Sequence, residues 1–226
     1  MSRALILTIA LATTAGAGLS SQAPDPSFTS RFDVEKSDFA STGRNPWFIL
    51  EPGYTLTLED SSTRLVITVL NETKVVDGVE TRIVEERETE KGALIEVSRN
   101  YFAISRRTNS VFYFGEDVDM YKDGKVINHE GAWLSGVGGA RFGLMMPGLP
   151  LMRARYFQEV APKVAMDRAE IVSLTESVKT PAGAFTNVLK MEETTPLEPN
   201  AKEAKFYAPG VGLIQDGDLK LLSVKK

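Results

Sequence analysis

Hydrophobic and polar residues alternate along most of the chain, in runs that are separated by turn residues. Leu65, Ile67 and Val69 occupy every second position, and the runs 94–104 and 111–120 are rich in β-branched and aromatic residues. Alternation with a period of two puts the apolar side chains on one face of a β-strand, and these residue types favour strands. The pattern therefore predicts long strands with one buried face.

Tight turns join the predicted strands. Asp77-Gly78 is the strongest hairpin signal, and Lys91-Gly92 and Asp123-Gly124 mark further turns. No window has a convincing helical period, although a short helix over 162–170 is a competing interpretation, and no internal repeat or linker divides the chain. We therefore predict a single all-β domain with an antiparallel, strongly curved sheet that forms an open barrel or a sandwich.

Residues 131–152 interrupt this pattern. Glycines and prolines frame the apolar residues 144–146 and Leu149. A long irregular segment inside a domain is uncommon and is usually functional or mobile. We therefore expect a long Gly/Met/Pro loop at 131–152.

The first 23 residues have the organisation of a secretory signal peptide. Arg3 precedes an apolar run, and small residues follow as far as Ala17 and Ala23, the two expected cleavage points. The apolar run is shorter than the ~20 residues that span a bilayer, with an uncleaved anchor as the alternative. Residues 24–226 then form one β-rich domain that begins with an extended lead-in, 24–45.

Composition narrows the setting and the partners. The chain has no cysteine, so lipid attachment through an N-terminal cysteine is excluded, and disulfide-free export indicates a bacterial envelope. The 26 Lys and Arg against 30 Asp and Glu give a net charge of −4. This balance argues against a nucleic-acid partner, which requires a basic face. We expect a periplasmic or extracellular protein without a transmembrane anchor after processing.

Motifs for metal or nucleophilic catalysis are weak. His129 is the single histidine and no Gly-x-Ser-x-Gly accompanies it, and a zinc site usually needs several His or Cys ligands. Asp117 and Asp119 begin like a calcium loop, but Tyr121 occupies the next alternate position. We expect no metal, no cofactor and a solvated strand face here, while cation binding by these two aspartates stays open.

Carboxylate pairs support an alternative function, a carboxylate-dependent hydrolase. Glu159 and Asp167 are the candidates, with Glu170 as a further acid and His129 at the rim. The dense acidic stretch 85–90 is interpreted as the solvated end of a strand. We assign no catalytic residue and favour a protein that is not an enzyme.

The Met- and Gly-rich segment supplies a candidate ligand site. Methionine side chains adapt to irregular partners, and an exposed apolar loop marks a ligand or partner site; completion of the core is the structural alternative. Arg141 would offer paired donors to an anionic headgroup. The candidate binding residues are Trp133, Arg141, Met145, Met146, Leu149, Met152 and Tyr156.

Two stretches near the C-terminus carry a family resemblance. They are Thr-Pro-Ala-Gly-Ala-Phe-Thr-Asn-Val at 180–188 and Lys-Phe-Tyr-Ala-Pro-Gly-Val-Gly-Leu-Ile at 205–214. This turn and closing hairpin resemble those of exported bacterial proteins with a largely uncharacterised, DUF3108-like C-terminal β domain, with Ile214 in place of the usual valine. Residues 131–170 are also similar to members of this group. The resemblance implies a β-rich fold and an envelope setting, and it supplies no catalytic residues.

Together these observations predict an exported, non-catalytic binding module. Its ligand would be hydrophobic or amphipathic, such as a lipid, or its partner would be a cell-envelope protein. The alternatives are a carboxylate-dependent hydrolase and a structural envelope protein without a small ligand.

Overall fold

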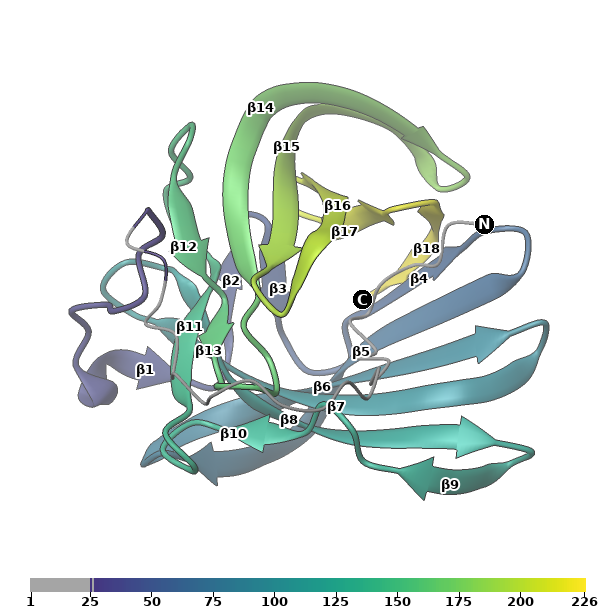
Figure 1. Cartoon of the computed structure of the whole chain (residues 1–226). Helices are drawn as coiled ribbons and strands as arrows, with labels where there is room; N and C mark the ends of the chain where they lie inside the picture. The colour runs from purple at the N-terminus through teal and green to yellow at the C-terminus, as the bar shows by residue number, and fades with distance from the viewer. Residues whose placement is uncertain (1–24, 26) are drawn as a thin grey trace.

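Long antiparallel strands joined by tight turns make up most of the protein (Figure 1). The computed structural model describes residue 25 and residues 27–226, so the predicted signal peptide, 1–23, lies outside the described residues. The described part of the chain contains one 3₁₀ turn, η1 (Lys36–Asp38), no α-helix, and hence no helix able to cross a membrane. The strands are β1 (Phe39–Ala40), β2 (Gly43–Asn45), β3 (Phe48–Leu50), β4 (Thr55–Glu59), β5 (Thr63–Val76), β6 (Val79–Glu90), β7 (Ala93–Ser105), β8 (Val111–Lys122), β9 (Lys125–Asn128), β10 (Trp133–Leu134), β11 (Arg141–Met146), β12 (Arg155–Phe157), β13 (Glu159–Val160), β14 (Arg168–Thr180), β15 (Gly183–Thr195), β16 (Glu198–Ala208), β17 (Gly212–Asp216) and β18 (Leu219–Lys225).

The main sheet curls until its two edges almost meet. Its strand order is β12-β14-β15-β16-β17-β18-β4-β5-β6-β7-β8-β11-β13, and both edge strands come from one short segment, 155–160. Figure 1 shows β14 and β15 arching over β5 to β8. This nearly closed barrel confirms the prediction of a single, all-β, strongly curved antiparallel domain.

The predicted hairpins occur where the turn dipeptides lie. Asp77 and Gly78 both have positive φ, +50° and +76°, as a two-residue type I′ turn requires. The turns at Lys91-Gly92 and Asp123-Gly124 have the same signs of φ. Because such turns match the right-handed twist of paired strands, they give β5 to β9 their common curvature.

Apolar side chains pack on both faces of the sheet. The inner face carries the larger cluster, which includes Leu58, Val69 and Met191. A smaller cluster lies on the outer face of β6 to β8, where Phe39 contacts Phe112 and Phe114 edge-on. The lead-in 24–45 therefore covers part of the outer face and includes β1 and β2 rather than being extended throughout.

Residues 131–152 are more regular than the expected continuous loop. They contain β10 and β11, both paired with β8. A Cβ at Gly143 would lie 2.4 Å from the Gln158 carbonyl oxygen, and one at Gly148 would lie 1.9 Å from the Thr108 carbonyl oxygen. Close backbone approach therefore accounts for two of these glycines. The competing helix over 162–170 does not form, since β14 begins at Arg168.

Candidate functional site

A cavity of about 490 Å³ lies inside the curled sheet. Part of its lining is apolar and aromatic. Along β4 to β8 every second side chain faces inward, and many of these inward-facing side chains are apolar. The volume is within the range of small-molecule pockets, roughly 300–1,000 Å³. This apolar wall includes Tyr54, Leu56, Val69, Val84, Phe102 and Tyr113.

The other part of the lining is acidic. Glu86 on β6, Glu96 on β7 and Glu116 on β8 line the cavity from three neighbouring strands. Glu86 is two residues from Val84, so the alternation that turns Val84 inward turns Glu86 inward as well. More acidic lining residues follow further round the sheet, at Glu159, Asp167, Glu193 and Asp216.

Burial makes these carboxyl groups hard to ionise. It raises the pKa of Glu86 and of Glu96 to about 7 and that of Glu116 to about 8. Glu88, directly opposite Glu96 in the β6–β7 pair, also has a pKa raised to about 7, first by burial and then by the charge of Glu96. The acidic wall, which we define as Glu86, Glu96 and Glu116, is therefore only partly ionised at neutral pH.

Glu159 and Asp167 form a buried pair on the far side of the cavity. The Asp167 backbone N–H donates a 2.5 Å hydrogen bond to the Glu159 carboxylate. Burial and the Asp167 charge raise the pKa of Glu159 well above its ordinary value, while burial and Glu193 raise that of Asp167 to about 7. Within residues 25 and 27–226, no group of three or more His, Asp or Glu side chains is placed to hold a metal ion.

Lys205 is the buried cation of the cavity lining, and two carboxylates already hold it. Its Nζ lies 2.9 Å from Glu193 Oε2 and 3.6 Å from Asp216 Oδ2. Burial alone would lower the pKa of Lys205, but Asp216 and Glu193 more than offset this and raise it well above its ordinary value. Lys205 is therefore a charged, paired ammonium group and not a nucleophile.

Four of the predicted binding residues lie in the interior. Met145 lines the cavity, while Met146 and Tyr156 are buried in the inner cluster. Trp133 is also buried and packs edge-on against Tyr113, with ring centroids 5.2 Å apart. Of these four residues, only Met145 lines the cavity, and the other three belong to the core.

The other three lie away from the cavity lining. Leu149 and Met152 are 77% and 52% exposed, in the segment between β11 and β12. Arg141 is partly exposed at the start of β11 and does not line the cavity. We expected Arg141 to bind an anionic headgroup. The acidic lining of the cavity disfavours a negatively charged group there.

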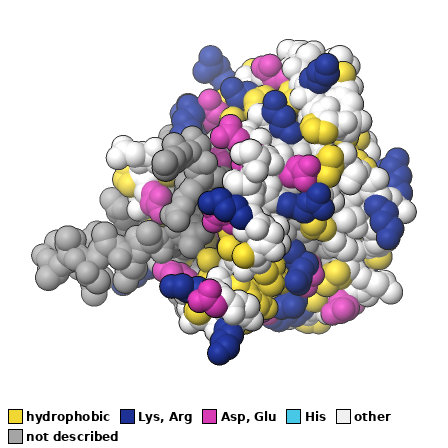
Figure 2. Space-filling view, turned by 90° about the vertical axis from the view of Figure 1, so that its right-hand side faces the viewer, with side chains coloured by type: hydrophobic (Ala, Val, Ile, Leu, Met, Phe, Trp, Pro, Cys, Tyr) yellow, Lys and Arg dark blue, Asp and Glu magenta, His cyan; other side chains and the backbone are white. Residues whose placement is uncertain are grey.

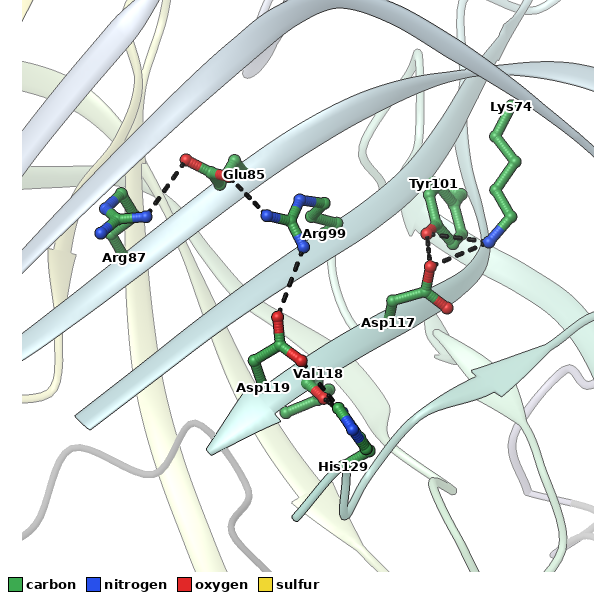
Figure 3. Close-up of polar contacts among 9 residues, drawn as sticks. All are labelled: Lys74, Glu85, Arg87, Arg99, Tyr101, Asp117, Val118, Asp119 and His129. Carbon is green, nitrogen blue, oxygen red and sulfur yellow. Dashed lines mark hydrogen bonds and ion pairs between the residues drawn. The ribbon is translucent and has the colours of Figure 1, made fainter. Parts of the chain in front are cut away.

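The polar residues around His129 lie on the outer face of the sheet (Figure 3). The His129 Nδ1 atom lies 2.9 Å from Asp119 Oδ1, and Arg99 contacts the same carboxylate at 3.5 Å. Asp117 accepts hydrogen bonds from Lys74, at 2.9 Å, and from Tyr101. Both aspartates are thus paired with protein cations, and His129 lies outside the cavity lining near the rim residue Glu130.

Sequence reasoning missed Glu86, Glu96 and Glu116. The stretch 85–90 was interpreted as a solvated strand end, whereas Glu86 lines the cavity. Alternation did not reveal them, because Val79 and Ile83 are apolar but lie at alternate positions to Glu86. Both faces of this strand carry apolar residues, so its pattern does not mark the inner face.

The outer surface shows no comparable gathering of acids on the face seen in Figure 2. Lys and Arg side chains are spread over that face and mixed with Asp and Glu.

Comparisons with protein-family models, curated proteins and solved structures find no match for this chain. The resemblance to DUF3108-like domains stays a prediction from the quoted motifs.

Proposed function

We propose that the protein binds an amphipathic small molecule inside the curled sheet, without catalysis. The observation that carries this proposal is the two-part lining of the cavity, apolar around Val69 and Phe102 and acidic around Glu96. An apolar ligand body would displace water from the first part, and a polar group would reach the second. Ligand pockets with this combination fix orientation through a few polar groups.

We also propose that the protein acts outside the cytoplasm after removal of residues 1–23 or 1–17. Cell fractionation followed by mass spectrometry of the N-terminus tests this. The expected mature chain begins at Pro24 or Gly18, in the periplasm or the medium. A full-length chain retained in the membrane fraction would contradict release.

A blocked cavity tests the binding proposal. Ala201 on β16 lines the cavity, whereas its exposed neighbour Asn200 lies on the same strand. We expect Ala201→Trp to abolish fluorescence enhancement of the neutral amphipathic probe N-phenyl-naphthylamine, and Asn200→Trp to leave it unchanged. Equal binding by both variants would place the probe elsewhere and overturn the proposal.

A carboxylate-dependent hydrolase is the second candidate, because Glu159 and Asp167 form a buried acid pair at the cavity. Mass spectrometry of molecules that co-purify with the protein separates the two functions. A bound molecule recovered unchanged after prolonged incubation supports binding. Accumulation of a hydrolysed product with the native protein, and not with Glu159→Gln, would support the hydrolase.

A further inference from the structure

Charge inside the cavity is unbalanced. Glu193 and Asp216 share Lys205, whereas no Lys, Arg or His of the described chain lies within ion-pair distance of Glu86, Glu96 or Glu116. These three carboxyl groups belong to adjacent strands. Glu86 on β6 pairs with Ser98 on β7, which is two residues from Glu96. Glu116 on β8 pairs with Asn100 on β7. No ion pair therefore neutralises these three carboxyl groups, and the charge of Lys205 acts on Glu86 without forming one.

Glu96 provides an independent indication that a ligand completes this wall. It is 6% exposed and lines the cavity, and its side chain makes no hydrogen bond or ion pair within the described part of the chain. A buried polar group normally has a partner, and the Glu96 carboxylate can reach one only through the cavity that it lines. The open volume in front of Glu96 is where such a partner would lie.

We infer that the acidic wall binds the ammonium group of an amphipathic amine whose apolar body lies against Val69, Val84 and Phe102. This inference rests on the proposed function and names the class of its ligand. An ammonium group supplies both the missing positive charge and N–H donors for Glu96 and Glu116.

Two alternative occupants fit less well. A hard metal ion requires several oxygens converging on one point, and the described acids do not form such a group. An anionic amphiphile, such as a fatty acid, would bring a further negative charge to Glu86, Glu96 and Glu116. An organic cation avoids both difficulties.

Calorimetric titration of the full mature protein at about pH 8 with octylamine, octanol and octanoate tests the inference. These probes share one chain and differ in head charge. We expect octylamine to bind at least about tenfold more tightly than either of the others, a difference of about 1.4 kcal/mol. In Glu96→Gln the octylamine affinity should fall by about tenfold and octanol binding should not change.

The control variant is Glu90→Gln, at an exposed position of β6, which should bind all three probes like the native protein. N-phenyl-naphthylamine binding verifies that Glu96→Gln keeps an open cavity. Tighter or equal binding of octanol or octanoate would overturn the inference and leave the proposed function intact. Failure of all three probes and of N-phenyl-naphthylamine would overturn both.

Discussion

Glu96 is 6% exposed and lies directly opposite Glu88 on the neighbouring strand. Like charges at opposed positions destabilise a sheet, and burial of an unpaired carboxylate adds to this effect. A glutamine would keep the shape and remove the charge. At Glu96 the proposed binding role therefore opposes the stability of the unliganded protein.

This opposition predicts the effect of Glu96→Gln on stability. The pKa of Glu96 is raised from 4.5 in the unfolded chain to about 7 in the folded protein, so the folded state holds a proton more tightly, and stability falls as pH rises between these values. At about pH 8 we expect the variant to be more stable by roughly 1–3 kcal/mol. Below about pH 4.5 the two proteins should differ little.

Thermal unfolding of both proteins over this pH range measures the difference, with Glu90→Gln as the exposed control. A variant that is less stable than the native protein at about pH 8 would show that Glu96 is well solvated or paired in the folded state.

Arg82 has a structural role that a single substitution tests. It is buried on β6, and its guanidinium donates to the Ser41 carbonyl at 2.9 Å and to Thr42 Oγ1 at 2.7 Å. It also donates to the Leu70 and Glu72 carbonyls at 3.4 and 3.3 Å. We expect Arg82→Met to lower the free energy of unfolding by about 2–4 kcal/mol, because all these acceptors lose a buried donor. Urea denaturation gives the loss, and limited proteolysis should show faster cleavage of the lead-in near Ser41.

Arg64→Met is the matched control. Arg64 is half-exposed and pairs with Glu59 at 2.8 Å, so its removal should change stability by less than about 1 kcal/mol. Similar losses in both variants would mean that Arg82 does not anchor the lead-in.

At the scale of elements, alternation and turn chemistry predicted the meander β5 to β9 well. The hairpin at Asp77-Gly78 is local, since two positive-φ residues and flanking β-branched residues determine it. Strand pairs such as β4 with β18 join distant parts of the chain, and no local pattern encodes them. The acidic wall was missed for a different reason: its three strands are consecutive, but apolar residues occupy both of their faces, so alternation does not show which face is the inner one.

Gly143 on β11 shows what the glycines of residues 131–152 do. Its backbone lies so close to residues 157–158 that an added Cβ would be 2.4 Å from the Gln158 carbonyl oxygen. We expect Gly143→Ala to lower stability by roughly 1–3 kcal/mol, because β11 and the strand facing it must separate. Gly92→Asn, in an open turn with nothing within 4 Å, should change stability much less.

Chemical denaturation measures both losses, and hydrogen exchange locates them. Faster exchange of the β11 and β13 amides in Gly143→Ala is expected, since these strands hold one edge of the sheet. Unchanged exchange there would mean that the backbone shifts to accept the methyl group.

At the scale of the whole molecule, the arrangement of charge would couple the proposed ligand binding to the release of protons. The cavity lining contains Glu86, Glu96, Glu116, Glu130, Glu159, Asp167, Glu193, Glu203, Asp216 and Asp218, with Lys205 and Lys202 as its lysines. Several of these acids are partly protonated near neutral pH, since the pKa of Asp167 is about 7 and that of Glu116 is about 8. An ammonium ligand would stabilise their ionised forms and expel those protons.

We therefore expect octylamine to release protons when it binds at about pH 7, and its affinity to rise between about pH 5 and pH 8. The sign follows because the free acids hold protons that the complex does not, while the amine stays protonated throughout this range. Calorimetry in phosphate and in Tris, whose ionisation enthalpies differ, counts the protons. The double variant Glu96→Gln/Glu116→Gln should release fewer. Proton uptake, or an affinity that falls as the pH rises, would show that the ligand does not meet these carboxyl groups.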